Sequence, residues 1–544
     1  MSPPLLDYDS LTRPAVLAPA LVLVSYFIYN IFFRPSPISK LAKQHKLPIV
    51  GARKGDWFPY TQAKWRNFGN FKAAALEADK VSREHNTAVL FPVLGTPNLV
   101  HLPRSEIQFV TDQPDSVLDA HAQAVESLQI DYTVSDPHLV HHPLHHKLIT
   151  TTLTSQIGNL VPDVADETDW AFNHHWGRPS EFDEVVVYET LRHVIGGVTN
   201  RVFVGAPLCR NQDLLEVGMS YANFVPLTSQ FLRLVWGPIK PLVAFFATMP
   251  AHKKFGQFEK LLLPEINKRL ADYDARQQDP EKFKGAEKEK NDFLQWCIKQ
   301  AKESGDPYLY KTSSLAGRVL LLNFAAIHTS SFSITHALLD IAYASDRDEI
   351  LAELRAEIAS CLEEFGNKDG DLKWNKQALN KMHKLDSLFR ESARLNSFVT
   401  IGLARTVRSP MTTPHTKITI PTGATVIVPS YPVMHSADHF DDPETFKPFR
   451  FADQRADEKT EYVKRAGKAF ASTSSDYLAF GHGKNACPGR FFAANELKLM
   501  LAYVVVTYDI EPVKGATERP SDQWFGINRV PDFGAKIRVR VRKA

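Results

Sequence analysis

The stretch Phe480–Arg490, with the sequence FGHGKNACPGR, constrains the fold more than any other part of the chain. Pro488 follows Cys487 directly, and an uninterrupted helix-like run continues from Phe491 to Tyr508. Proline is favoured at the first position of a helix, where its missing N–H costs nothing. The sequence therefore predicts Cys487 as the N-cap of this helix, where the helix dipole and the unpaired N–H groups favour the thiolate.

Three glycines near Cys487 fit the close approach of a flat ligand to its sulfur. Gly481 and Gly483 allow the preceding backbone to turn tightly, and Gly489 removes a side chain beside the cysteine. A cysteine thiolate is one of the groups by which proteins hold haem iron. For an isolated Cys-Pro-Gly sequence, a buried structural cysteine after an ordinary turn is the alternative.

The whole segment resembles the haem-binding loop of the cytochrome P-450 family, Phe-Gly-x-Gly-x-(Arg/His)-x-Cys-x-Gly. The positions that fall in register are Phe480, Gly481, Gly483, Cys487 and Gly489. The resemblance implies haem b as cofactor, with Cys487 as axial ligand of the iron and with Phe480, Gly481 and Gly489 beside the haem. Asn485 stands where the family usually has Arg or His near a haem propionate, and the adjacent Lys484 is our candidate for that contact.

A long helix is predicted over residues 314–343, which contain no proline and no glycine after Gly317. Within it, Ala325–Ser330 reads AAIHTS and places polar groups in an apolar helix. Serine and threonine there can bond carbonyls of their own helix and merely bend it. Beside the cysteine loop, however, the segment is similar to the oxygen-binding groove of the family, which implies that Thr329 acts on the oxygen side.

His328 stands where the family has an acid, and we expect it to relay protons near neutral pH. This variant of the groove resembles that of filamentous-fungal members that oxidise terpenoids and related secondary metabolites. The resemblance thus indicates a substrate class.

A weaker pair of motifs follows. Residues 381–395 have an amphipathic helical pattern in which Glu391 and Arg394 lie three apart and so share a face. An exposed salt bridge, which contributes little to stability, is the usual explanation of such a pair. With Pro448–Phe451 downstream, the pair resembles the Glu-Arg-Arg triad of the family, and Arg450 is then its third member. We expect this triad to be structural and to lock the segment ahead of the cysteine loop.

Basic residues for the haem propionates are less clearly marked. The family normally has a Trp-x-x-x-Arg motif, and by register His142 and His146 replace its two named residues, with Lys147 adjacent. The resemblance therefore implies a propionate contact by His146 or Lys147. Arg405 aligns with a further family arginine that pairs with a propionate, and Arg408 is its nearby rival.

The same region suggests a second hypothesis, because histidine is repeated at positions 138, 141, 142, 145 and 146. The pairs His141/His145 and His142/His146 are four apart, which on a helix is the spacing of a metal site. A histidine-rich surface turn is the alternative, since no third ligand stands nearby in the sequence.

Residues 14–33 carry no charge and are long enough to cross a membrane as one helix. Basic residues are frequent after this stretch, whereas only Arg13 precedes it, so we expect the body of the protein in the cytosol. A cleaved signal peptide is the alternative, and the acidic head argues against it. The predicted organisation is a short lumenal N-terminus at 1–13, a transmembrane anchor at 14–33, a proline-rich and basic linker at 34–55, and a haem-thiolate domain at 56–544. The resemblance implies the endoplasmic reticulum.

The remaining patterns predict local structure. Helices are expected at 71–84 and over much of 160–275, strands at 87–94, 98–102, 417–420 and 425–429, an edge strand at 535–541, and irregular chain at 115–136. Residues 228–250 are conspicuously apolar and predict either helix-hairpin packing or a second membrane-dipping patch. The net charge of +3 with both signs interspersed argues against a nucleic-acid partner. Four distant cysteines argue against a disulfide framework and a zinc ribbon.

The predicted fold is mainly α-helical with a small β-rich lobe, the cytochrome P-450 fold, preceded by one transmembrane helix. The resemblance implies a membrane-bound monooxygenase that inserts one atom of O2 into an apolar small molecule. Its electrons would come from NADPH through a separate flavoprotein reductase, which would dock on basic residues such as Lys484 and Arg490. The alternatives are a haem-thiolate isomerase or dehydratase, and a membrane-tethered haem- or lipid-binding protein without turnover.

Overall fold

A computed structural model describes residues 21–22, 24–26, 29, 37–96, 98–284, 288–366 and 374–543. The chain forms two compact units. The first comprises residues up to 109 together with 113–119 and 404–428, and the second comprises 110–112, 120–403 and 429–544.

The first unit is built around a small mixed sheet. Its strand order is β1 (Val89–Leu90), β2 (Leu99–His101), β8 (Thr425–Val428), β5 (Gly402–Val407) and β3 (Leu118–Asp119). Strands β2 and β8 are parallel, with Leu99 opposite Thr425, whereas β1 pairs with β2 in antiparallel fashion. A separate antiparallel pair joins β6 (Met411–Thr412) and β7 (Thr419–Ile420). The predicted strands are therefore present, but each is shorter than expected.

Helices of the first unit precede its strands in the sequence. They are α3 (Pro37–His45), α4 (Pro59–Gly69) and α5 (Phe71–His85). Helix α6 (Ile107–Asp112) follows β2, and its residues are divided between the two units. The helix predicted at 71–84 is α5. It begins where the side chain of Asn70 accepts a hydrogen bond from Ala73 N–H, and it ends at Asn86 in the left-handed conformation.

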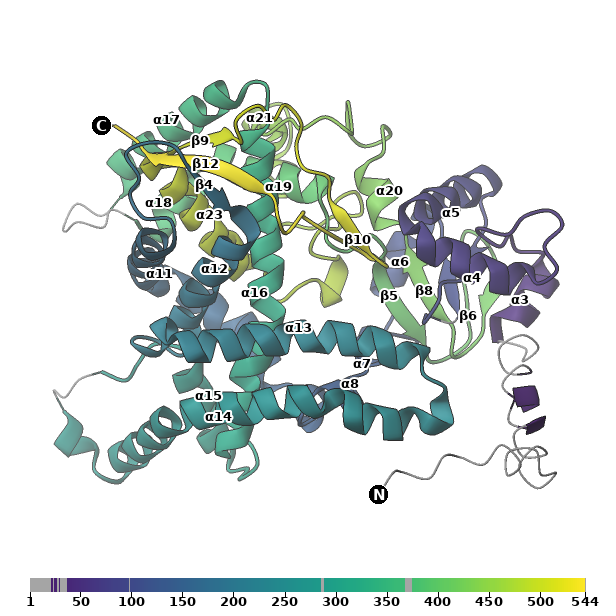
Figure 1. The fold of residues 1–544 in the computed structure, drawn as a ribbon, viewed down its shortest axis with the longest axis horizontal. Helices are drawn as coiled ribbons and strands as arrows, with labels where there is room; N and C mark the ends of the chain where they lie inside the picture. The colour runs from purple at the N-terminus through teal and green to yellow at the C-terminus, as the bar shows by residue number, and fades with distance from the viewer. Residues whose placement is uncertain are drawn as a thin grey trace, which may run out of the picture. The chain divides into compact units, whose positions relative to one another are not determined.

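The second unit is mainly helical (Figure 1). Its helices up to the longest buried one are α7 (Ala120–Leu128), α8 (Ile130–Thr133), α9 (His138–His141), α10 (Leu144–Leu148), α11 (Thr154–His175), α12 (Val187–Phe203), α13 (Gln212–Leu234), α14 (Lys240–Gln278), α15 (Phe293–Ser304) and α16 (Thr312–Ala342). Those that follow are α17 (Arg347–Phe365), α18 (Lys376–Lys381), α19 (His383–Leu395), α20 (Ser430–Met434), α21 (Arg450–Ala456), α22 (Tyr462–Ala466) and α23 (Arg490–Thr507). The mainly α-helical prediction is confirmed.

Helix α16 is the centre of this unit, because most of its side chains are buried. It packs against α12, α13, α14 and α19, and Figure 1 shows it running through the helical part of the chain. The long helix predicted at 314–343 is therefore confirmed. The expectation of irregular structure at 115–136 is wrong, since α7 and α8 occupy most of it. The alanines of α7 favour a helix that the polar composition of the region concealed.

Two small sheets lie in the C-terminal part of the second unit. One has the order β4 (Asp183–Val186), β12 (Lys536–Val541), β9 (Tyr508–Pro512), and the other is the hairpin of β10 (Gln523–Phe525) and β11 (Asn528–Val530). A strand was expected at 535–541 and is present as β12, but the expectation that it lies at the edge of a sheet is wrong, because β12 is the central strand. Its alternating charges pair across the sheet on both sides: Lys536 with Glu184, Arg538 with Glu511 and Arg540 with Asp509.

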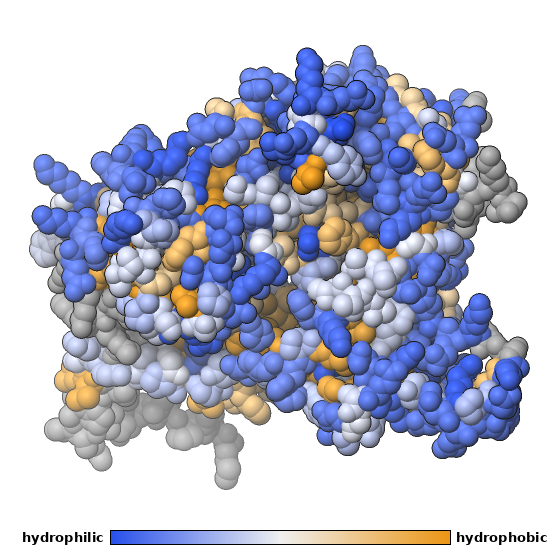
Figure 2. All heavy atoms as spheres, turned by 180° about the vertical axis from the view of Figure 1, so that it is seen from behind, coloured by the Kyte–Doolittle hydropathy of each residue, from blue (hydrophilic) through white to orange (hydrophobic). Residues whose placement is uncertain are grey.

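Large hydrophobic side chains are exposed where α13 ends and α14 begins. They are Leu227, Phe231, Leu234, Ile239, Leu242, Phe245, Phe246 and Met249. Helices α13 and α14 run side by side (Figure 1). On the face seen from behind, Figure 2 shows hydrophobic residues in patches among hydrophilic ones. Exposure of these side chains argues against simple helix-hairpin packing as the reason for the apolar stretch 228–250.

Most of the predicted transmembrane anchor, residues 14–33, lies outside the described residues. Within the described ranges, no helix has both the length and the apolar character needed to cross a membrane.

Candidate active site

The cysteine loop is closed by its own backbone. The N–H of Cys487 donates to the carbonyl of Phe480 at 2.8 Å. Gly481 and Gly483 have φ angles of +71° and +73°, in the left-handed region that favours glycine. A Cβ on Gly483 would stand only 2.9 Å from the Cβ of Thr111. The turn ahead of the cysteine therefore requires glycine for both conformation and space.

Helix α23 begins at Arg490, with Gly489 as its N-cap. The prediction of Cys487 as the N-cap is wrong by two residues. Cys487 to Arg490 instead form a turn, in which the side chain of Arg490 donates to the carbonyl of Cys487 at 2.8 Å. Pro488 belongs to this turn and not to the first helical position.

Cys487 is exposed, whereas Cys209, Cys297 and Cys361 are buried. Desolvation by the surrounding protein raises the pKa of the Cys487 thiol above its ordinary value. The backbone N–H groups of Gly489 and Arg490 and the charge of Arg490 act in the opposite direction. The sulfur thus combines an open side with two N–H donors, and a cation on the open side would favour the thiolate.

The second part of the site is the face of α16 that carries Thr329. Ala325 and Thr329 are exposed, one turn apart, in a helix that is otherwise mostly buried. The hydroxyl of Thr329 donates to the carbonyls of Ala325 at 2.9 Å and Ala326 at 3.3 Å. Small side chains and one hydroxyl therefore form the open face, which leaves room for a ligand beside the helix.

His328 does not share this open face. Its Nδ1 lies 2.9 Å from the hydroxyl of Tyr188 in α12, and its Nε2 is buried. Burial lowers the pKa of His328 to about 4. The side chain is therefore neutral near pH 7, which argues against the expectation that it titrates there as a proton relay.

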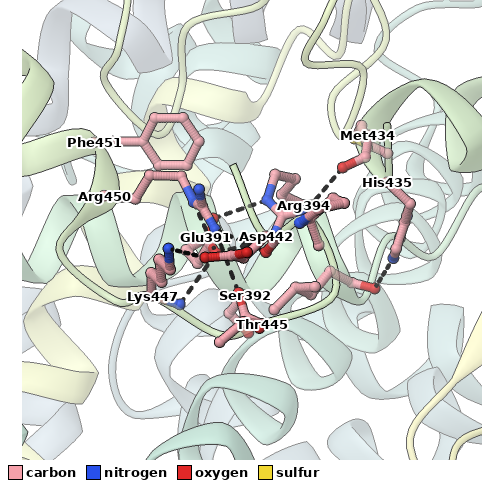
Figure 3. A network of polar contacts seen from close by, with 12 residues as sticks. Glu391, Ser392, Arg394, Met434, His435, Asp442, Thr445, Lys447, Arg450 and Phe451 are labelled. Carbon is pink, nitrogen blue, oxygen red and sulfur yellow. Dashed lines mark hydrogen bonds and ion pairs between the residues drawn. The ribbon is translucent and has the colours of Figure 1, made fainter. Parts of the chain in front are cut away.

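The Glu391, Arg394 and Arg450 side chains meet in a buried ionic cluster (Figure 3). Arg394 donates to both carboxylate oxygens of Glu391, at 2.8 and 2.9 Å, and Arg450 approaches both at 3.1 Å. Glu391 and Arg394 are fully buried. Arg394 also donates to the carbonyls of Met434 and Pro443, at 2.7 Å each. The cluster therefore fastens the chain after α20 to helix α19.

The sequence model of the cytochrome P-450 family matches residues 104–533, which include the cysteine loop, the α16 groove and this ionic cluster. The chain belongs to the cytochrome P-450 family. It is an oxidoreductase of the monooxygenase type.

Several fungal P-450 proteins are similar over almost the whole chain. The cytochrome P-450 monooxygenase gloP of Glarea lozoyensis is 30% identical over 507 residues, covering 91% of this chain and 90% of the relative. The cytochrome P-450 monooxygenase pbrC of Penicillium brasilianum is 28% identical, and the match covers 97% of this chain and 96% of the relative. The cytochrome P-450 monooxygenase astC of Aspergillus terreus is 28% identical, with 97% of each chain covered.

The residues of the loop fit the haem that a P-450 protein binds. Cys487 offers an exposed sulfur, and a Cβ added to Gly489 would meet no atom within 4 Å. Phe480 is half-buried and packs on Phe470 with ring centroids 5.0 Å apart, so it supports the loop from the protein side. A soft thiolate donor with open space beside it suits a flat iron complex.

The basic residues expected at the propionates fall into two groups. His146, Lys147 and Lys484 are exposed in the second unit, to which Cys487 also belongs. Arg405 belongs to the first unit, where it is buried and donates to the carbonyl of Ala404 at 2.9 Å. Its rival Arg408 is more exposed and pairs with Asp119.

The proposed metal site among the histidines is wrong: within the described ranges, no group of three or more His, Cys, Asp or Glu side chains could hold a metal ion. Pro143 separates α9 from α10, so the four-residue spacing does not place the histidines on one helix face. The rings of His138 and His142 instead lie tilted against each other with centroids 4.1 Å apart, and His141 pairs with Asp131 at 3.0 Å.

Other polar residues of α19 support the cysteine loop and were not expected from the sequence. Arg390 donates to the carbonyls of Ala469 and Ser472, and its guanidinium lies 3.7 Å from the ring centre of Tyr477. Asp386 forms an ion pair with Lys498 of α23 at 3.2 Å. Polar residues at 386, 390 and 394 lie on one helical face, and this spacing was the available signal.

Proposed function

We propose that Cys487 binds haem as the axial thiolate and that the chain oxidises an apolar small molecule with O2. The observation that carries this proposal is the exposed cysteine in a glycine-turned loop, just ahead of α23 and facing two backbone N–H groups. Haem held in this way supplies the activation of O2.

The chain's own residues have three tasks in this reaction. The cysteine loop fixes the sulfur through the Cys487-to-Phe480 hydrogen bond. The open face of α16 gives the substrate space at Ala325, and the Thr329 hydroxyl holds a proton beside that space. The Glu391–Arg394–Arg450 cluster keeps the chain ahead of the loop in place and takes no part in proton transfer.

The substrate we favour is a fungal secondary metabolite, with terpenoids as one class. Two observations support this choice. The relatives come from fungi, and small, uncharged residues dominate the open face of α16. A face without charge favours an apolar substrate, because an apolar molecule loses no hydrogen bonds when it leaves water there.

NADPH is the proposed source of electrons, delivered by a separate flavoprotein reductase. The basic residues Lys484 and Arg490 flank Cys487 and suit an acidic surface on that partner. Turnover with NADPH should therefore require added reductase.

We also propose that residues 14–33 anchor the protein in the endoplasmic reticulum membrane with its catalytic part in the cytosol. The charge-free stretch and the basic residues after it support this. Alkaline extraction of fungal microsomes should leave the full chain in the membrane pellet. Release of the full chain into the supernatant would refute the anchor.

The deciding experiment is the carbon-monoxide difference spectrum of the reduced protein. We expect a strongly red-shifted Soret band in the wild type, no such band in Cys487→Ser, and an unchanged band in the Cys361→Ser control. A wild-type band at the position of histidine ligation would overturn the assignment of Cys487. Absence of haem from the purified wild type would overturn the proposed function.

A further inference from the structure

His328 stands beside Thr329 in sequence but is bound to other helices. Its Nδ1 meets the Tyr188 hydroxyl at 2.9 Å, and Tyr188 lies in the first turn of α12. The backbone carbonyl of Met219, in α13, favours a proton on the ring. Nδ1 is already engaged by Tyr188, so only Nε2 can serve this carbonyl, although no hydrogen bond of ordinary geometry is formed there. The ring therefore faces α12 and α13.

The Met219 carbonyl favours one of the two neutral tautomers. With the proton on Nε2, towards the Met219 carbonyl, Nδ1 is an acceptor and Tyr188 donates its hydroxyl proton. Aromatic packing holds Tyr188 in this position, since its ring stacks on Phe332 and Phe533 with centroids 5.4 and 4.5 Å apart. Both partners of the hydrogen bond are therefore fixed by neighbouring elements.

The surroundings oppose a charged imidazole. Burial lowers the pKa of His328 to about 4, and the cation of Arg192 in α12 contributes in the same direction. Arg192 is itself paired with Glu189 at 2.6 Å. Within α16 the neighbouring group is the Phe332 ring, 6.2 Å from the imidazole, and α13 contributes the uncharged Met219. None of these described groups would stabilise a positively charged His328 imidazole at neutral pH.

We propose that His328 and Tyr188 are positioning residues, which tie the Thr329 turn of α16 to α12, and that His328 donates no proton during turnover. This inference rests on the proposed function of the α16 groove. At position 328, where the family usually has an acid that can titrate, this chain has a histidine that forms a hydrogen bond between α16 and α12. Protons must reach the groove by way of Thr329 and its open face.

The first test examines the protein without turnover. Nuclear magnetic resonance of 15N-histidine-labelled protein should show His328 as the neutral Nε2–H tautomer from pH 8 down to about pH 5, with the signal assigned by its loss in His328→Asn. Tyr188→Phe should lower the thermal unfolding midpoint. The Ser331→Ala control should not, because that hydroxyl donates to the carbonyl of Ile327 in its own helix. Titration of His328 between pH 6 and 8 would overturn the proposal.

The second test follows product formed per NADPH consumed against pH. His328→Asn keeps an acceptor near the Nδ1 position but cannot relay a proton, so we expect coupling within about 2-fold of wild type and an unchanged pH profile. His328→Leu should lose coupling, because the Tyr188 hydroxyl is left buried without a partner. Loss of coupling in His328→Asn together with a changed pH profile would identify a proton donor and refute the positioning role.

The two proposals fail in different ways. A normal carbon-monoxide spectrum with a titrating His328 would refute only the positioning role. An absent red-shifted band in the wild type would refute the proposed function, while the tautomer and stability measurements would still decide whether the interhelical bond exists.

Discussion

At the scale of single residues, Thr329 and Cys487 are exposed although the elements around them are largely buried. The Thr329 hydroxyl donates to carbonyls of its own helix, so its oxygen can still accept a hydrogen bond from a molecule on the open face. Cys487 offers its sulfur in the same unit of the chain. An exposed polar side chain within a mostly buried element indicates a ligand site more specifically than the residue type alone does.

Thr329→Ala tests whether the hydroxyl takes part in the reaction. We expect the ratio of product to NADPH consumed to fall by about 10-fold or more, because a positioned proton-transfer group is lost. Thr329→Ser keeps the hydroxyl and should retain most of the coupling. The measurement is product yield against NADPH and hydrogen peroxide. Full turnover in Thr329→Ala without uncoupled hydrogen peroxide would instead favour an isomerase or dehydratase, which needs no activation of O2.

Sequence patterns found some of these residues and missed others for a clear physical reason. The loop from Phe480 to Gly489 could be recognised because its parts are consecutive. The partner of His328 could not, since Tyr188 is 140 residues away and the contact depends on how α12 packs on α16. Burial, which decides the protonation state of His328, also arises from packing and is not visible in the order of residues.

At the scale of elements, α19 organises the chain that leads to the cysteine loop. Its Glu391 and Arg394 hold the segment after α20, and its Arg390 holds residues 469 and 472. Periodicity predicted the helix and the shared face of Glu391 and Arg394. It could not place β12 in the middle of its sheet, because alternation reveals a buried face but not the number of neighbouring strands.

Breaking the α19 cluster should destabilise the protein. Arg394→Ala leaves the Glu391 carboxylate buried with fewer partners, and we expect a loss of about 3–5 kcal/mol, as for other broken buried ion pairs. The exposed pair of Lys284 with Glu281 provides the control, and Lys284→Ala should cost about 1 kcal/mol or less. Thermal unfolding and haem retention measure both variants. Equal midpoints for the two would contradict a locking role for the cluster.

At the scale of the whole molecule, buried titratable groups set the dependence of stability on pH. Burial lowers the pKa of His101 and His145 to about 4 and that of His336 and His435 to about 3. Their ordinary pKa is 6.5, so the unfolded chain binds more protons than the folded chain between these values. Stability should therefore rise as the pH increases from about 4 to 6.5, in both units of the chain.

Ionisation of Glu496 in α23 has the opposite effect, because it lowers the stability of the folded protein as the pH rises. Its side chain is 2% exposed, and Thr199 of α12 donates to Oε1 at 2.9 Å, while Oε2 is buried without a partner. Burial raises the pKa of Glu496 from 4.5 to about 8. Between pH 4.5 and about pH 8, the Glu496 carboxyl therefore keeps its proton in the folded protein and loses it in the unfolded chain. The stability contributed by the protonated form is complete below pH 4.5 and is lost progressively up to about pH 8.

Glu496→Gln should isolate this contribution. Glutamine keeps an acceptor for Thr199 but does not ionise, so the decline of the unfolding midpoint between about pH 6.5 and 8 should be smaller than in the wild type. The exposed Glu281→Gln should reproduce the wild-type profile, because its loss changes no buried charge. Thermal unfolding of all three across pH 5–9 provides the comparison. Parallel profiles for wild type and Glu496→Gln would mean that Glu496 is already ionised at neutral pH, which would require a positive partner for Oε2 between α23 and its neighbours.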